Sequence, residues 1–303
     1  MKALPLDQVP NEKGKVKPRF TKDIISKLKG HANDYFKAGA DFFNAKKYYP
    51  EAYEGFMIYA DMPNQDFMQG EKLDLPDADR GTAYFNAGLA AYSGNEIYKS
   101  ADAFRKSRGV GYDDKQAFIY EIACWQAAAQ RDSTMEQTAK QKIMEVAEEG
   151  DAKYGVAEPI FINNIVNFLV SDSKFDQAVA KVSSLIDANP DNANLYGLRG
   201  FVYDRMGNDD ASVEDYKKSA SIDGVDFETL KNAGKKIYRV GADKWNAIEG
   251  TGEEANAARQ NVKVNYFEAA KAIANKAKAM NADDSEVDYL IENIDYALTT
   301  FFN

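Results

Sequence analysis

The sequence predicts an all-α protein built from about six stacked helix pairs and closed by one more helix at its C-terminal end. Three observations predict it. Only eight prolines and 20 glycines occur in 303 residues, which leaves long stretches free of helix breakers. Valine and isoleucine rarely alternate with polar residues, so strand signals are scarce. Small and aromatic residues recur about every 34 residues along most of the chain.

The repeat is clearest in two consecutive copies that begin at Pro159 and Ala193. The second copy has a glycine where two antiparallel helices would cross, and large residues on either side of it: Tyr196, Gly200, Tyr203 and Tyr216. A small residue at the crossing lets two helices approach closely, while large residues fill the space around it. Looser copies begin near residues 32, 81, 117 and 227. Arg199 is the exception, because the pattern expects an apolar side chain there.

The last copy is longer than the others. Its first helix is predicted from Asp226 to about Ala247, and the segment EGTGEE ends it. A second helix is predicted from about Ala255 to Met280. Residues 285–302 are amphipathic, and we expect a capping helix there because an open end of a repeat stack must be covered.

This pattern resembles the tetratricopeptide repeat (TPR) family over roughly residues 32–281. The resemblance implies a right-handed α–α superhelix, a TPR-like α-solenoid, as a single domain over residues 31–303. The composition is rich in Asn, Tyr, Asp and Lys and is similar to that of cell-envelope members from Bacteroidota. Residues 1–30 precede the repeats and carry a net charge of +5, so we expect a basic lead-in that is either solvated or docked on an acidic surface.

Few residues offer chemistry for catalysis. Cys124 and His31 are each the only residue of their type, which excludes Cys–His pairs, Ser–His triads and cysteine-based metal clusters. Cys124 stands at a glycine position of the repeat, so we interpret it as a small buried residue. The loops GVGYDD and GTGEE are interpreted as lacking the lysine or following helix of a phosphate cradle. The sequence therefore predicts no catalytic residue, no metal site, no cofactor and no enzyme.

The charge and hydropathy exclude other classes. The net charge of −10 argues against a nucleic-acid binder, because phosphate binding needs a basic face. No apolar run approaches the ~18 residues of a membrane span. The compartment is left open: the periplasm or cell envelope if a signal lies upstream of Met1, and the cytoplasm otherwise.

The resemblance implies a concave groove lined by the first helix of each pair. Carried over position by position, the candidate peptide-binding residues are Tyr92, Trp125, Asn163, Asn164, Asn167, Asn194, Phe201, Arg205, Lys231, Lys235 and Arg239. The same positions hold Phe85, Phe118 and Glu121. For the aromatic residues the alternative is packing against the next helix, and for the asparagines it is simple solvation. For the three basic residues from Lys231 to Arg239 it is pairing with the protein's own acids.

The expected function is a non-enzymatic scaffold that binds a peptide or protein segment in this groove. One alternative is a glycan-binding envelope protein that stacks sugars on exposed aromatic rings. Another is a purely structural subunit of a larger complex. The identity of the partner and the oligomeric state are left open.

Overall fold

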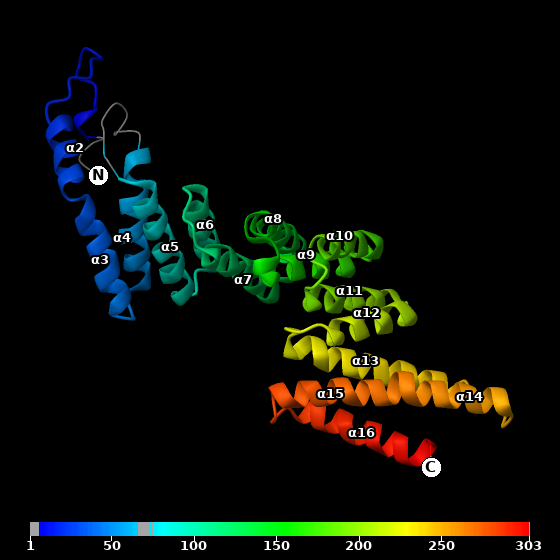
Figure 1. The fold of residues 1–303 in the computed structure, drawn as a ribbon. Coiled ribbons are helices and arrows are strands. Elements are labelled where there is room, and N and C mark those ends of the chain that lie inside the picture. The colour runs from blue at the N-terminus through cyan, green and yellow to red at the C-terminus, as the bar shows by residue number, and fades with distance from the viewer. Residues whose placement is uncertain (1–5, 66–72, 74, 303) are drawn as a thin grey trace. The chain divides into compact units, whose positions relative to one another are not determined.

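The structure, a computed structural model, describes residues 6–65, 73 and 75–302 (Figure 1). Within these residues it contains helices and no strand, so the predicted all-α class is confirmed. The chain divides into two compact units, Met1–Asn164 and Ile165–Asn303, and each is described by itself. The division falls inside α9 (Pro159–Ser171).

The first unit consists of helices that follow one another along the chain. Helices α3 to α8 each pack against the next one along the chain. The elements are α2 (Thr21–Gly30), α3 (Ala32–Asn44), α4 (Tyr49–Asp61), the 3₁₀ turn η1 (Met62–Asn64), α5 (Asp77–Ser93), α6 (Ile97–Gly109), α7 (Lys115–Arg131), η3 (Ser133–Met135), α8 (Glu136–Tyr154), η4 (Gly155–Ala157) and the start of α9.

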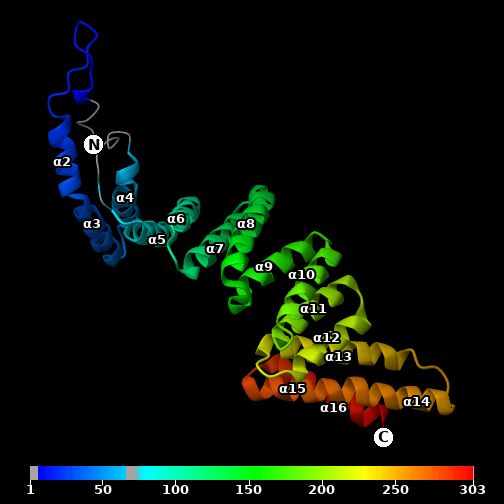
Figure 2. The ribbon, with the colours of Figure 1, turned by 45° about the horizontal axis from the view of Figure 1, so that its top comes forward.

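The second unit continues the pairing of helices and ends in a longer hairpin. Figure 2 shows α13 beside one long helical run formed by α14, η5 and α15, with α16 packed on that run. The elements are the rest of α9, α10 (Phe175–Ala188), α11 (Ala193–Met206), α12 (Asp209–Ser221), α13 (Phe227–Asn246), α14 (Glu253–Val262), the π-helical turn η5 (Lys263–Glu268), α15 (Ala269–Met280) and α16 (Ser285–Phe301).

Glycines lie where the helices of a pair cross, as the repeat pattern predicts. A Cβ atom on Gly88 would lie 2.6 Å from the ring of Phe104, so no larger residue fits without movement of that ring. Gly200 holds the same repeat position, and its Cβ would lie 3.3 Å from the ring of Tyr216. The close approach of the two helices therefore depends on the missing side chain.

Buried serines bond the second helix of a pair to the first. In the pair α11–α12, the hydroxyls of Ser212 and Ser219 donate to the carbonyl oxygens of Gly200 and Ala193, both at 2.8 Å. The pair α5–α6 has both bonds at the same sequence spacing: Ser100 Oγ to Gly88 O at 2.9 Å and Ser107 Oγ to Gly81 O at 2.8 Å. Repeated serines thus give each of these two pairs the same hydrogen-bonded register.

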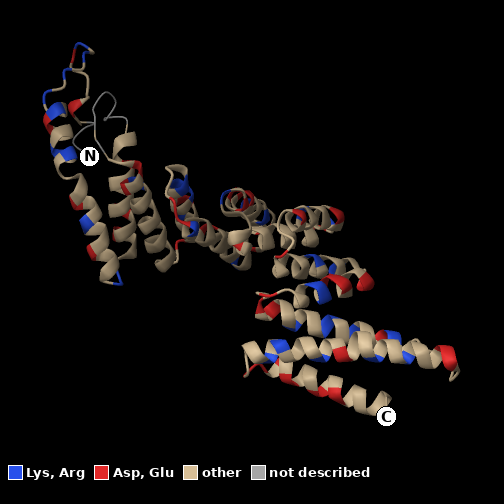
Figure 3. Ribbon diagram, viewed as in Figure 1, with Lys and Arg blue, Asp and Glu red and all other residues tan. Residues whose placement is uncertain are grey.

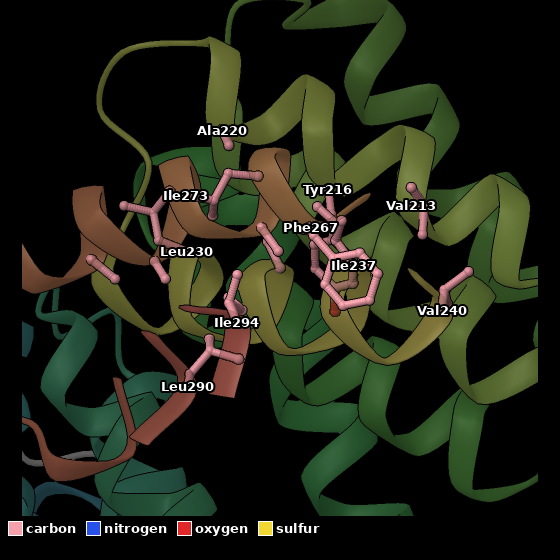
Figure 4. Packing of buried hydrophobic residues seen from close by; sticks show 14 of the residues in the cluster. Val213, Tyr216, Ala220, Leu230, Ile237, Val240, Phe267, Ile273, Leu290 and Ile294 are labelled. Carbon is pink, nitrogen blue, oxygen red and sulfur yellow. The ribbon is translucent and has the colours of Figure 1, made fainter. Parts of the chain in front are cut away.

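The C-terminal helix covers the apolar end of the second unit, as predicted. Val287, Leu290 and Ile294 of α16 are all buried. They join the core formed by α13 and α15, which includes Leu230 and Ile237 (Figure 4). Because these α16 residues are three or four apart, they share one helix face and leave the opposite face to solvent.

The long helical run contains a feature that the sequence did not indicate. Residues Lys263–Glu268 form a π-helical turn, which inserts one extra residue into the α-helical period. Both Tyr266 and Phe267 thereby face α13: a Cβ on Gly241 would lie 2.6 Å from Tyr266, and Phe267 is fully buried.

The expected basic lead-in contains ordered structure. Helix α2 lies within it, and the Asp7 carboxylate accepts hydrogen bonds from the backbone N–H groups of Arg19, Phe20 and Thr21 at 2.7–3.0 Å. The Thr21 hydroxyl also donates to Asp7 and, with these N–H groups, lowers the pKa of Asp7 to about 2. Asp7 therefore anchors the chain at the start of α2.

Candidate binding surface

An open cavity of about 490 Å³ lies between α13 and α16 in the second unit. Leu290 is buried at its floor, and Tyr238 is half-buried beside it. Tyr289 stands at the rim with 69% of its surface exposed. The complete lining is Lys235, Tyr238, Ser285, Glu286, Tyr289, Leu290 and Asn293.

The way α16 begins and packs explains this arrangement. Asp284 caps the helix by accepting from the N–H groups of Glu286 and Val287, which fixes its first residue. Because one face of α16 is buried in the core, the opposite face points to solvent, and Tyr289 and Tyr296 on it are each 69% exposed. These two tyrosines are seven residues apart, so they share one side of the helix.

Ion pairs join the two walls of the cavity. Lys235 Nζ lies 2.6 Å from Glu286 Oε2, and this hydrogen bond lowers the pKa of Glu286. Lys231 is nearly buried and pairs with Glu228 at 3.0 Å and with Asp284 at 3.4 Å. Its hydrogen bond to Glu228 is the main cause of its raised pKa. Both lysines therefore engage the protein's own acids, the alternative that the sequence left open.

Arg239 also meets an internal acid. Its Nη2 atom lies 2.7 Å from Asp204 Oδ1, although the side chain remains 60% exposed. Asp204 is shared with the buried Lys236, at 2.5 Å. The basic row that the sequence predicted on α13 is thus largely compensated within this unit.

The candidates on α11 have different roles. Asn194 Oδ1 accepts from the backbone N–H of Asp226 at 2.9 Å, so this side chain ties α11 to the start of α13. Phe201 is half-buried and packs against the core of the second unit. Arg205 is exposed near the end of the helix.

The asparagines of α9 are not equivalent. In the first unit, Asn163 is exposed, whereas Asn164 donates to its own helix at Ile160 O and accepts from Gln126 at 3.5 Å. Asn167, in the second unit, is exposed. Asn163 and Asn167 therefore present amide groups to solvent, whereas Asn164 is partly used within the fold.

The aromatic candidates of the first unit are mostly packed. Phe118 is only 2% exposed and lies 5.8 Å from the ring of Phe161. Trp125 is half-buried, and its Nε1 atom is buried without a hydrogen bond of ordinary geometry. Trp125 nevertheless lies near enough to Glu121 to oppose the rise that burial causes in the pKa of that carboxyl. Tyr92 is exposed at 42%.

A buried ion pair in the first unit was not foreseen from the sequence. Glu121, expected in the groove, is 2% exposed and accepts from Arg108 Nη2 at 2.7 Å. Burial raises the pKa of Glu121, and the Arg108 guanidinium opposes that shift. Arg108 also bonds Glu149, so one guanidinium links α6, α7 and α8. One feature of the sequence indicates such a pair: Arg108 lies in the last turn of α6 and has no acid one turn away in its own helix.

Among residues 6–65, 73 and 75–302, no group of three or more His, Cys, Asp or Glu side chains is placed to hold a metal ion. Within the same ranges, no helix has the length and apolar character needed to cross a bilayer.

Comparison with known proteins gives one family and several structural neighbours. Residues 70–238 match the family model described as "Bacterial NAD-glutamate dehydrogenase, catalytic domain". No curated protein matches the chain. Similar solved structures include a TPR repeats protein from Bacteroides fragilis, with 16% identity, a TM-score of 0.43, and coverage of 88% of this chain and 98% of that chain.

Two further neighbours are also repeat proteins. A tetratricopeptide repeat protein from Parabacteroides merdae has 11% identity and a TM-score of 0.45, covering 88% of this chain and 99% of that chain. The TPR2AB domain of yeast Sti1, solved with an HSP90 peptide, has 13% identity and a TM-score of 0.29, at 88% and 99% coverage. The neighbours are TPR proteins, two of them from Bacteroidota, as the resemblance stated from the sequence predicted.

The family match corrects one expectation. The sequence predicted that the chain is not an enzyme, and this prediction is wrong on the finding that residues 70–238 match the catalytic domain of a dehydrogenase. The error came from judging catalysis by short motifs and by the types of residue present.

The match implies NAD, and the glycine loop Gly109–Asp114 lies within the matched range. The interpretation that this loop lacks a lysine and a following helix is wrong, because Lys115 and helix α7 follow it directly. However, the Asp114 carboxylate already accepts from Gln116 N at 2.8 Å at the start of α7, and Lys115 pairs with Glu158. Helix α6, not a strand, precedes the loop. These residues do not fit a dinucleotide phosphate, which needs open N–H groups at the helix start.

Proposed function

We propose that this chain, which belongs to the family described as bacterial NAD-glutamate dehydrogenase, catalytic domain, binds a segment of another protein in the cavity between α13 and α16. The cavity is the single observation that carries the proposal. Its volume lies within the range of ordinary ligand sites, and it combines an apolar floor with polar groups at the rim.

The groups around the cavity suit an extended peptide. Leu290 and Tyr238 offer an apolar floor for one side chain of the ligand. Asn293 Nδ2 donates to Tyr289 O at 2.7 Å, which leaves its Oδ1 atom as an acceptor for a backbone N–H group. Side-chain pockets with backbone acceptors beside them are the usual means by which proteins hold peptide segments.

The remaining groove candidates of this unit extend the proposed surface only in part. Arg205 is exposed at the side of α11, whereas Arg239 of α13 is exposed but already paired with Asp204. Three other candidates are already in contact with the rest of the unit and are not free to bind a ligand: Lys231 pairs with Asp284, Asn194 bonds to Asp226, and Phe201 packs on the core. Asn163, Asn164, Tyr92 and Trp125 belong to the first unit, and we assign them no part in this cavity.

A random peptide library displayed on phage tests the proposal. We expect the wild-type chain to select peptides that the double variant Tyr289→Ala/Asn293→Ala fails to retain. Both residues lie away from the buried core, so circular dichroism should show an unchanged helix content. Tyr98→Ala, an exposed tyrosine of α6, is the matched control and should select the same peptides as wild type.

Two results would contradict the proposal. One is that wild type and the double variant select the same peptides, since the cavity would then play no part. The other is that the wild-type chain retains no peptide but shows Tyr289-dependent binding to an oligosaccharide array, which would favour a sugar ligand stacked on the exposed rings.

A further inference from the structure

Resting on the proposed function, we infer that the bound segment is basic: an arginine or lysine of the partner lies on the ring of Tyr289, between Glu286 and Glu292. Glu286 and Glu292 are three residues before and after Tyr289, so all three side chains are neighbours on the helix surface. All three are exposed.

The charge of α16 is the first support. The helix carries four acids and no lysine or arginine. Figure 3 shows acidic but no basic colouring along it. Asp288 and Asp295 are paired with Lys278 and Lys271 of α15. Among the residues that the structure describes, Glu292 has no cationic partner. One carboxylate beside Tyr289, the rim residue of the cavity, therefore remains to be matched by a ligand.

The rings of the second unit give independent support. Lysines of this unit lie over aromatic rings in several places, for example Lys231 over Phe227 at 5.0 Å and Lys244 over Tyr266 at 5.6 Å. No described cation lies over Tyr289, although its ring is the most open of the cavity lining. A cation from a partner would complete the same contact there.

An acidic ligand would be less favourable. Lys235 is the only basic side chain of the cavity lining, and its Nζ atom is already 2.6 Å from Glu286. An incoming carboxylate would have to displace Glu286 and would approach the unpaired Glu292. The chain as a whole carries a net charge of −10, which also attracts a basic partner at long range.

The experiment uses the peptides selected by the wild-type chain. We expect arginine and lysine to be enriched relative to the starting library. We then measure binding of one selected peptide by fluorescence anisotropy and replace its basic residue with glutamine. The replacement should weaken binding about five- to tenfold, the combined size of one exposed cation–π contact and one exposed ion pair.

Variants of the chain separate this inference from the proposed function. Glu292→Gln should weaken binding of the basic peptide and leave binding of its glutamine version unchanged. Glu254 is an exposed acid on α14, and Glu254→Gln should change the binding of neither peptide. Peptides that depend on Tyr289 and Asn293 but lack enriched basic residues would overturn the inference and leave the proposed function standing. Absence of any Tyr289-dependent peptide would overturn both.

Discussion

Arg199 of α11 and Asp215 of α12 form a two-point ion pair, with Nε to Oδ2 at 2.7 Å and Nη2 to Oδ1 at 2.8 Å. The third guanidinium nitrogen donates to Ser183 of α10 at 3.0 Å. One arginine therefore links three consecutive helices, and its hydrogen bonding to Asp215 raises its pKa. This explains a charge at a position where the repeat pattern expects an apolar side chain, because the half-buried Arg199 compensates the buried Asp215 carboxylate.

Arg199→Ala should destabilise the second unit strongly, because it leaves the buried Asp215 carboxylate without its cation. We expect a loss of about 2–4 kcal/mol in the free energy of unfolding, measured by urea denaturation with circular dichroism. Arg199→Met with Asp215→Leu should recover most of it, since an apolar pair needs no compensation. Arg205 is an exposed arginine of the same helix, and Arg205→Ala should change the free energy of unfolding by less than about 0.5 kcal/mol. Equal losses in the single and double variants would contradict this account.

Gly88 and Gly200 occupy the same repeat position but should differ in their tolerance of alanine. A Cβ on Gly88 meets the Phe104 ring at 2.6 Å, so Gly88→Ala should destabilise by about 1–3 kcal/mol through overpacking. On Gly200 the contact with Tyr216 is 3.3 Å, and the gain in helix propensity offsets it, so Gly200→Ala should stay within about 1 kcal/mol of wild type. Thermal melts compare the two variants, and an equal or smaller loss for Gly88→Ala would contradict this explanation.

Cys124 should resist thiol reagents in the folded chain. Burial raises the pKa of its thiol to about 11, against an ordinary value of 9.0, and its Sγ atom donates to Ser100 Oγ at 3.2 Å. At pH 8 the thiolate fraction is then about 100-fold lower than that of a free cysteine. The stabilisation from the neutral thiol is complete below pH 9 and is lost as the pH rises through about 11.

The reaction of Cys124 with Ellman's reagent measures this directly, because the chain has one cysteine. Native protein should react slowly at pH 8 and fast in urea. The control is Cys124→Ala with Ser133→Cys, which moves the thiol to an exposed turn and should react fast under both conditions. Fast native labelling of Cys124 would show that the thiol is accessible.

The helix pairs could be predicted because their signal is local. Gly200 and Tyr216 lie within one repeat, and their spacing alone indicates a close crossing of two helices. The capping role of α16 was also readable, since Leu290 and Ile294 fall on one face of a short segment. The π-helical turn was not readable, because the burial of Phe267 appears only when α13 is packed beside it.

The candidate site was less predictable because its partners are far apart in sequence. From the sequence, Lys235 is expected to be an unpaired basic residue. Its partner Glu286 lies 51 positions later in the chain, and only the packing of α16 places the two side chains together. The cavity itself depends on that packing. The spacing of Tyr289 and Tyr296, seven residues apart, indicates an aromatic outward face on α16. The sequence interpretation missed this face because it treated the helix only as a cap.

Asp7 makes the start of α2 sensitive to acid. Its carboxylate has a pKa of about 2 in place of 3.8, chiefly because the Thr21 hydroxyl donates to it. An acid whose pKa is lowered by folding stabilises the fold above its unfolded pKa, and this stabilisation is lost as the pH falls through the folded value. We therefore expect the amides of Phe20 and Thr21 to be protected from hydrogen exchange at pH 4–5, after correction for intrinsic rates, and to lose protection toward pH 2. Asp7→Asn should weaken this protection at pH 5, whereas Asp23→Asn on the exposed face of α2 should not. Equal protection in wild type and Asp7→Asn would mean that other contacts hold this segment in place.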